Sequence, residues 1–114
     1  MYTQRYGNKY GAKSQTYDGL SYHSKKEAGY AQELDLRVKA KDIKSWRRQV
    51  KIPIEVNGFF ICNYYIDFVI THNDGWEEWV EVKGFETEVW RLKWKLTEAI
   101  FDKDFPERVL TVVK

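Results

Sequence analysis

The sequence predicts a mixed α/β domain of order α-β-β-β-α-β, in which helices flank a mixed central sheet. Two segments with the apolar spacing of amphipathic helices, 24–41 and 87–101, enclose three segments that alternate as strands do. A short apolar segment, 109–113, follows the second helix and is typical of a buried strand. The chain has 114 residues, enough for one core of this kind, so we expect a single domain over 1–114.

The first helix is predicted to begin at Ser24, a good N-cap residue followed by strong helix formers, and to end between Val38 and Lys41. Its core-facing stripe follows helical spacing and consists of Glu27, Tyr30, Ala31, Leu34 and Val38. Glu27 has two open interpretations. Its carboxylate can cap the helix from the capping-box position, or it can point at whatever the helix packs on.

The first strand is predicted over 46–54, and Pro53 places its end at an edge or a bend. Alternation predicts two sides: Trp46, Arg48, Val50, Ile52 and Ile54 on one, and Arg47, Gln49 and Lys51 on the other. Asn57 and Gly58 mark a turn into the next strand, 59–62.

A hairpin at the centre of the chain joins strands 64–71 and 76–83 through Asn73-Asp74-Gly75, residue types that tolerate left-handed backbone. A three-residue loop places Asp67 opposite Glu81, with Cβ atoms roughly 5 Å apart. Lys83 then shares the face of Glu81. The other face is expected to be apolar and carries Ile66, Phe68, Ile70, Val80 and Val82.

Two facing carboxylates repel each other, so one takes up a proton or the pair destabilises the sheet, unless a cation lies between them; a hard divalent ion is the natural occupant. Oxygen ligands suit Mg²⁺, Mn²⁺ or Ca²⁺. The inference depends on the register, because a two-residue turn at Asp74 and Gly75 would send Asp67 and Glu81 to opposite faces. A solvated strand face with an incidental alternation of charges is the alternative.

The second helix is predicted over 87–101, with Pro106 in the connection to the last strand. Its buried stripe is expected to contain Val89, Leu92, Leu96, Ala99 and Ile100. Three aromatic residues, Trp90, Trp94 and Phe101, widen this face. A basic flank consists of Arg91, Lys93 and Lys95.

Charges are segregated along the chain although the net charge is only +2. Residues 1–26 have five Lys or Arg and one Asp, and residues 37–51 have seven Lys or Arg and one Asp. Between 52 and 90 there are eight acids and one Lys. The basic segments can hold a polyanion while a metal offsets the central acids, or each can be a solvated surface.

Residues 1–22 are expected to form an irregular, basic and tyrosine-rich arm. Lys9 and Lys13 lie between its tyrosines, which can stack on bases, or which cover the core instead. No apolar run approaches the ~20 residues that cross a bilayer. We see no signal peptide, and the single cysteine, Cys62, forms no internal disulfide, so a cytoplasmic setting is expected.

Other chemistries lack support in the sequence. His23 and His72 have no partner at metal-ligand spacing. No Ser/His/Asp arrangement is discernible, and no glycine-rich loop leads from a strand into a helix. A paired-carboxylate glycosidase has no obvious use for Lys83 between the acids or for the basic flanks.

One ordered set of residues carries a resemblance to a known superfamily. A carboxylate on the first helix (Glu27), an Asp in the second main strand (Asp67), and Glu-x-Lys in the third strand followed by Gly (Glu81-Val82-Lys83-Gly84) together resemble the PD-(D/E)XK nuclease core. The chain departs from the motif at Ile66, where the name of the motif has Pro. Most of its length is also similar to a phage family of small proteins of unknown function predicted to be such nucleases, and to Holliday-junction resolvases of the phage endonuclease I type.

The resemblance implies a restriction-endonuclease-like fold and metal-dependent hydrolysis of DNA phosphodiester bonds. Asp67, Glu81 and the Val82 carbonyl would hold Mg²⁺, for which Mn²⁺ can substitute, and Glu27 would bind a second ion or a metal-bound water. Lys83 would orient water or stabilise the attacked phosphate. The catalytic set is thus Glu27, Asp67, Glu81 and Lys83.

We therefore expect a Mg²⁺-dependent endodeoxyribonuclease with branched or duplex DNA as its partner, a Holliday junction first among the substrates. Two symmetric cuts imply a homodimer, and a phage protein would act in the host cytoplasm. DNA contacts are expected from Lys9, Lys13, Lys25, Lys26, Arg47, Arg48, Gln49, Lys51, Arg91, Lys93 and Lys95. The alternatives are a non-catalytic nucleic-acid-binding module on the same fold and a nicking or flap nuclease.

Overall fold

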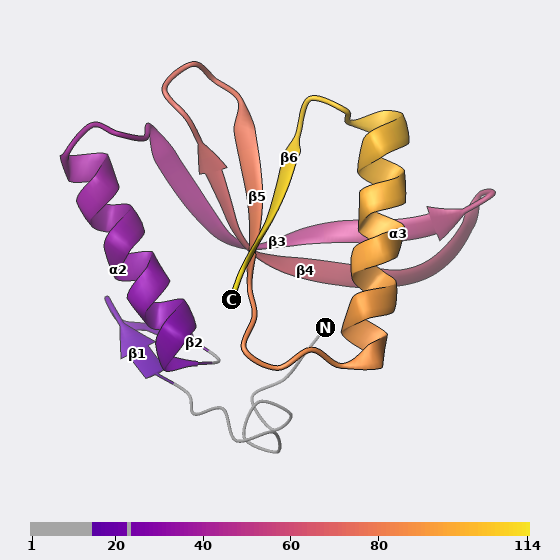
Figure 1. The fold of residues 1–114 in the computed structure, drawn as a ribbon, viewed down its shortest axis with the longest axis horizontal. Coiled ribbons are helices and arrows are strands. Elements are labelled where there is room, and N and C mark those ends of the chain that lie inside the picture. The colour runs from indigo at the N-terminus through magenta and orange to yellow at the C-terminus, as the bar shows by residue number, and fades with distance from the viewer. Residues whose placement is uncertain (1–14, 23) are drawn as a thin grey trace.

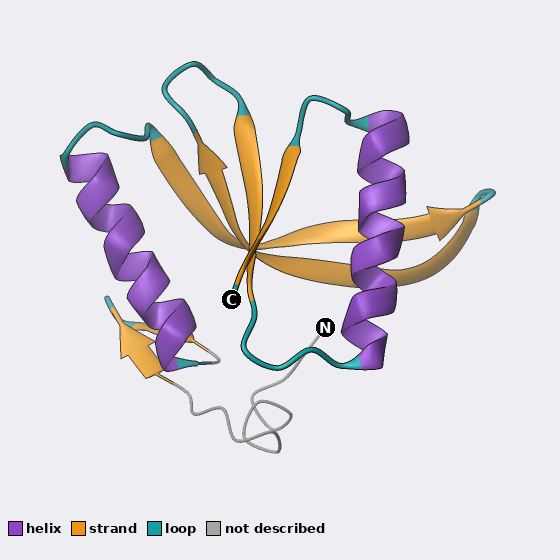
Figure 2. Ribbon diagram, viewed as in Figure 1, coloured by secondary structure: helices purple, strands orange, loops and turns teal. Residues whose placement is uncertain are grey.

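A computed structural model describes residues 15–22 and 24–114 and has a mixed α/β fold (Figures 1 and 2). In chain order the elements are β1 (Gln15–Tyr17), β2 (Leu20–Tyr22), α2 (Lys25–Lys39), β3 (Ser45–Val56), β4 (Phe59–Thr71), β5 (Glu77–Val82), α3 (Glu88–Asp104) and β6 (Val109–Val113). One sheet has the order β3-β4-β5-β6, antiparallel except for the parallel pair β5 and β6. From α2 onward the predicted α-β-β-β-α-β order is confirmed, and it is compatible with a restriction-endonuclease-like core.

The N-terminal arm is more regular than predicted where the structure describes it. β1 and β2 form a hairpin whose two-residue turn, Asp18-Gly19, has φ of 52° and 76°. Asp and Gly accept the left-handed backbone of such a turn, so the sequence does contain the signal for it. Tyr22 is buried in the core, as the alternative interpretation of the arm's tyrosines expected. Residues 1–14 lie outside the described residues.

Both helices begin at side-chain caps. Ser24 accepts the Glu27 N–H at 3.1 Å, and Thr87 accepts the Trp90 N–H at 3.0 Å. Each hydroxyl satisfies one of the backbone donors that a helix N-terminus leaves unpaired. The predicted start and stripe of α2 are confirmed: Glu27, Ala31 and Leu34 are buried.

The central hairpin has the predicted register. Phe68 pairs with Val80 and Thr71 with Glu77, and the His72 N–H donates to the Trp76 carbonyl. The loop is therefore residues 73–75, and Gly75 has a φ of 93° that suits glycine. Extended by one position this register would place Asp67 opposite Glu81, but the paired ladder ends at Phe68 and Val80.

β3 and β4 form a long ribbon that bends sharply where Gln49 meets Asp67 (Figure 1). Gln49 has a φ of 50°, a conformation that side chains other than glycine seldom adopt. The pairs on either side, Arg48↔Phe68 and Val50↔Ile66, share one register, but Gln49 and Asp67 are not paired. The backbone of the ribbon is thus interrupted at these two residues.

This bend corrects the prediction about which side the residues of the first strand face. Trp46 and Phe68 pack beside α2, whereas Val50 and Ile66, an even number of positions away, pack beside α3. Simple alternation would keep all four on one side, so the predicted sides of the first strand are wrong beyond Gln49. The ribbon changes the face it presents because a left-handed residue breaks the alternation.

Two apolar clusters cover opposite faces of the sheet, with α2 beside one face and α3 beside the other (Figure 2). The prediction of one apolar and one polar face is therefore wrong. Val69 and Trp79, which have the parity of Asp67 and Glu81, are buried next to α3. A sheet covered by helices on both sides needs apolar residues at both the odd and the even positions of its strands. A polar side chain inside such a sheet interrupts this apolar pattern locally.

The buried stripe of α3 differs from the prediction. Trp90, Thr97 and Phe101 are buried, while Val89 and Leu92 are 63% and 60% exposed. Aromatic side chains bury more apolar area than Val or Leu, so the helix turns its Trp and Phe residues inward. Trp90 also donates an indole hydrogen bond of 2.9 Å to the Tyr64 hydroxyl, which fixes the helix rotation.

Within residues 15–22 and 24–114, neither helix has the length and apolar character that crossing a membrane requires.

The inward face of α3 gives a matched pair of stability predictions. Phe101→Ala should lower the free energy of unfolding by about 3–5 kcal/mol, because it opens a cavity under Trp79. Glu98→Ala should change it by no more than about 0.5 kcal/mol, because Glu98 is exposed on the outer side of the same helix. Urea denaturation followed by tryptophan fluorescence measures both. Equal costs would contradict the orientation of α3.

Candidate functional site

Asp67 lies at the bend of the ribbon with both carboxylate oxygens engaged. Its Oδ2 accepts the Val82 N–H at 2.9 Å, and its Oδ1 accepts the Gln49 amide at 3.3 Å. The residue is 1% exposed. The side chain therefore links β3, β4 and β5 at the point where the ladder between β4 and β5 has ended.

Gln49 is positioned by its unusual backbone. A φ of 50° places the residue outside regular strand geometry, and its side chain reaches Asp67. Such a conformation costs on the order of 1–3 kcal/mol and persists where the surrounding structure imposes it. Gln49 was predicted as a DNA contact; here its amide orients a site carboxylate.

Glu81 and Lys83 lie at the end of β5 and form an ion pair. Lys83 Nζ is 3.7 Å from Glu81 Oε2 and 5.1 Å from the centre of the Trp90 ring. Glu81 is fully buried, while the Lys83 side chain is 11% exposed. Trp90, which is itself held by Tyr64, thus supports the ammonium group beside the carboxylate.

Glu27 approaches from the other helix. It is 3% exposed on the first turn of α2, and its negative charge acts on Asp67. Its backbone N–H is bound by Ser24, so the cap of α2 uses the Ser24 hydroxyl. Both interpretations of its carboxylate, a cap or a member of the site, stay predictions.

Burial and neighbouring charge hold the pKa of Asp67 well above its usual range. Desolvation is the largest cause, followed by the negative charges of Glu81 and Glu27. The Val82 N–H and the Lys83 ammonium act in the opposite direction and do not overcome it. Negative charge is therefore concentrated in this buried region beyond what its own cation offsets.

Several acids of the central segment have partners away from the bend. Glu77 accepts from Arg47, and Glu78 lies between His72 and Thr111, at the hairpin end of the sheet. Asp67 and Glu81 are buried instead, and the charges of Glu81 and of Glu27 on α2 both act on Asp67. The charge excess predicted for residues 52–90 is therefore partly neutralised away from the site.

The chemistry of the donor set fits a hard divalent cation. Carboxylate oxygens are the ligands that Mg²⁺ prefers, and burial, together with the negative charges of Glu81 and Glu27, raises the pKa of Asp67. Over residues 15–22 and 24–114, however, no group of three or more His, Cys, Asp or Glu side chains is arranged to hold one ion. The convergence of Glu27, Asp67 and Glu81 on a cation, and the part of the Val82 carbonyl, stay predictions.

The predicted DNA contacts differ in how free their charges are. Lys25, Lys26, Lys51 and Lys95 are exposed, and Lys93 is half-buried. Arg47 pairs with Glu77 at 3.1 Å and Arg91 with Glu86 at 3.4 Å, both largely exposed pairs. Exposed ion pairs contribute little stability, so a phosphate can replace the carboxylate. Lys9 and Lys13 lie outside the described residues.

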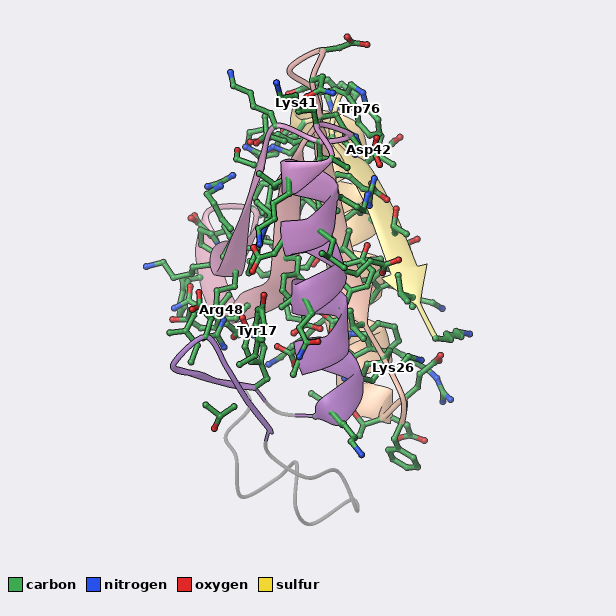
Figure 3. All side chains as sticks on the ribbon, turned by 90° about the vertical axis from the view of Figure 1, so that its left-hand side faces the viewer. Tyr17, Lys26, Lys41, Asp42, Arg48 and Trp76 are labelled. Carbon is green, nitrogen blue, oxygen red and sulfur yellow. The ribbon has the colours of Figure 1, made fainter. Side chains whose placement is uncertain are left out.

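Arg48 is directed inward rather than toward solvent. Its guanidinium lies 4.3 Å from the centre of the Tyr22 ring, a cation–π contact between β3 and β2. In Figure 3, Arg48 and Tyr17 lie on one side of α2, and Lys26 lies near its N-terminal end. The contact indicates a structural role for Arg48 in holding the β1–β2 hairpin against the sheet.

The sequence pattern assigned no role in the candidate site to two residues that contribute to it. Tyr64 and Trp90 form a buried pair that supports Lys83. Sequence periodicity shows only that both are aromatic and suited to a core. Their effect on a charged group depends on the rotation of α3, which no local signal specifies.

The raised pKa of Asp67 predicts a pH-dependent stability. The folded chain keeps a proton that the unfolded chain releases near pH ~3.9, so the free energy of unfolding falls as pH rises from there toward the raised pKa. Asp67→Asn removes this loss, and in EDTA its advantage in melting temperature over the wild type should grow as pH rises above about 4, until Asp67 ionises in the folded chain. Differential scanning fluorimetry measures it, with Asp74→Asn in the exposed hairpin loop as control. A difference independent of pH would contradict the assignment.

Comparisons with known proteins give one match. Neither the curated proteins nor the solved structures contain a match to this chain. A family model described as "Protein of unknown function (DUF1064)" matches residues 7–114, which include every element of the fold and every residue of the site. The chain belongs to this family of proteins of unknown function.

Proposed function

We propose that this protein is a Mg²⁺-dependent endodeoxyribonuclease with a PD-(D/E)XK-type site, and that branched DNA such as a Holliday junction is its leading substrate. One observation carries the proposal. The Asp67 carboxylate lies at the bend of the β3–β4 ribbon in an α-β-β-β-α-β core. It accepts a hydrogen bond from the N–H of Val82, the residue between Glu81 and Lys83 in the chain. The order of elements and of these residues matches the resemblance found in the sequence.

The protein side chains have separable roles in this proposal. Asp67 and Glu81 supply carboxylate oxygens, and Glu27 supplies a third from α2. Lys83, supported by Trp90, places a positive charge where a phosphate oxygen gains negative charge during hydrolysis. The same charge favours the ionised forms of the two acids.

Bound Mg²⁺ would lower the pKa of a coordinated water and offset the charge that grows on the phosphate. The residues suited to hold it are Asp67, Glu81 and the Val82 carbonyl, with Glu27 nearby. Gln49 and the Val82 N–H fix the orientation of Asp67 from outside the ligand set. Hydrogen-bond partners of this kind, which lie outside the ligand set, commonly change the affinity of a site for its metal ion.

The number of exposed cations supports DNA as the partner. Lys25 and Lys26 on α2, Arg47 and Lys51 on β3, and Arg91 with its neighbours on α3 come from three elements of the fold. Phosphate contacts of this kind give salt-dependent affinity without sequence preference. A substrate recognised by shape, such as a junction or a flap, suits that type of contact.

A non-catalytic nucleic-acid-binding module is the second candidate. The observation in its favour is that the described residues contain no ready group of three metal-ligating side chains. Such a module would keep the basic residues and bind DNA, but it would not cut DNA in the presence of divalent ions. The two candidates therefore differ in cleavage and not in binding.

Cleavage assays separate the two candidates. Wild-type protein should cut at least one of labelled four-way junction, flap, duplex or single-stranded DNA in Mg²⁺ or Mn²⁺ and none in EDTA. Asp67→Asn should lose more than about 100-fold in rate, since even outer partners of a metal ligand cost about 10–100-fold. Its DNA affinity, measured by fluorescence anisotropy, should persist or rise. If no substrate is cut with any divalent ion, the nuclease proposal fails and the binding module leads.

Gln49 gives a second test of the site, read from the dependence of cleavage on the Mg²⁺ concentration. Gln49→Gly keeps a backbone that accepts φ of 50° and removes the amide. We expect the thermal stability to be retained or raised, and the Mg²⁺ concentration for half-maximal cleavage to rise about 10–100-fold. Gln49→Asn, which also tolerates this backbone and keeps an amide, should recover part of the loss. An unchanged Mg²⁺ dependence in Gln49→Gly would limit Gln49 to a structural role.

A further inference from the structure

Two exposed apolar patches stand apart from the candidate site. The tip patch, at the turn between β3 and β4, consists of Val56, Phe59, Phe60 and Ile61, which are 44–73% exposed. The helix patch, at the start of α3, consists of Phe85, Val89 and Leu92, which are 60–63% exposed. Exposed aromatic and aliphatic side chains in contiguous sets mark interaction surfaces more often than isolated ones do.

The tip patch is carried on a projecting two-stranded ribbon. β4 pairs with β5 only over residues 68–71, so the part of the ribbon beyond the bend has no strand beside it in the described sheet. Figure 1 shows this ribbon passing α3 and ending beyond it. One face is covered by α3 through Ile52, Ile54 and Tyr64, while the tip reaches past this cover. A protruding tip of this shape is suited to contact a second molecule.

The charge of the ribbon argues for a protein partner over DNA. Residues 52–66 contain one charged residue, Glu55, and no Lys or Arg. A hairpin that inserts into DNA needs cations next to its apolar wedge to neutralise phosphates. Lys51 on β3 is the exposed cation next to this segment, and the tip patch itself, at residues 56–61, carries none. The tip patch therefore fits an apolar protein surface.

The two patches together match the size of a stable protein interface. Their seven side chains expose on the order of 800 Å², which is about what each partner contributes to an interface of standard size. One patch protrudes and the other lies on a helix flank, and both belong to the same chain. In a twofold dimer a contact between unlike patches occurs twice, once in each direction.

From these observations we infer that the protein forms a twofold homodimer in which the tip patch of each copy packs on the helix patch of the other. Each chain then covers its partner's Val89 and Leu92 and has its own covered in return. The inference specifies the interface of the dimer that symmetric cutting requires, and to that extent rests on the proposed function. Its test measures mass alone, so its failure and that of the nuclease proposal are distinguishable.

Sedimentation of the full chain tests the interface. The wild type should have the mass of two 13.7 kDa chains at micromolar concentration. Two double variants should each sediment as monomers: Phe59→Lys/Phe60→Lys and Val89→Glu/Leu92→Glu. In each, dimer formation would bury two charged side chains against an apolar patch. Leu36→Lys is the matched control, since Leu36 is 64% exposed on α2 outside both patches, and it should remain a dimer. Circular dichroism of each variant checks that the fold is retained.

Mixing the two charged variants tests the exchange itself. A mixed dimer has one contact between Lys and Glu side chains and one contact between wild-type patches. We therefore expect the mixture to recover the dimer mass although neither variant dimerises alone. If tips packed on tips, or helices on helices, mixing would restore nothing and the inference would be wrong.

Two further outcomes overturn the inference. The first is a wild-type chain that sediments as a monomer up to about 100 µM. The Kd of any dimer is then above that concentration, which corresponds to a binding free energy weaker than about −5.5 kcal/mol. A dimer that survives both double substitutions uses another surface. If the monomer instead loses DNA affinity on Phe59→Ser/Phe60→Ser, the tip patch contacts DNA.

Discussion

The structure depends on the interruption of the β3–β4 ribbon at Gln49 and Asp67. Because Gln49 adopts a left-handed backbone, the ribbon bends, and its apolar side chains pass from the α2 side of the sheet to the α3 side. The same interruption leaves Asp67 outside the strand ladder, with an oxygen available to the Val82 N–H. One strained residue thus sets both the packing of the helices and the position of the central carboxylate.

The residues of the site are held by parts of the fold that do not otherwise meet. Trp90 binds Tyr64 through its indole N–H and lies under the Lys83 ammonium, so the rotation of α3 determines where that charge lies. Glu27 is placed by the Ser24 cap of α2 on the other side of the sheet. A change in the packing of either helix would therefore alter the electrostatics around Asp67 before it altered the strand order.

Much of the fold follows from local chemistry, and the parts that do not follow have identifiable causes. The caps at Ser24 and Thr87 and the left-handed turn at Gly75 define the helix starts and the register of the central hairpin. The side on which Val50 and Ile66 pack cannot be predicted from the sequence, because the alternation rule assumes extended backbone throughout and Gln49 has a left-handed backbone. The exposure of Val89 and Leu92 was also unpredictable, since helical periodicity alone cannot rank Trp90 and Phe101 above them.

The buried acids are difficult to explain as structural residues alone. Asp67 and Glu81 are at most 1% exposed and Glu27 is 3% exposed, and Lys83 is the cation that the structure places against Glu81. An apolar side chain at any of these three positions would avoid the desolvation of a carboxylate, and replacing buried charges in this way is often neutral or stabilising. This cost supports the proposed role of the three acids in binding a cation. The strain at Gln49 points the same way, because a glycine would adopt φ of 50° without strain but would leave Asp67 without the amide.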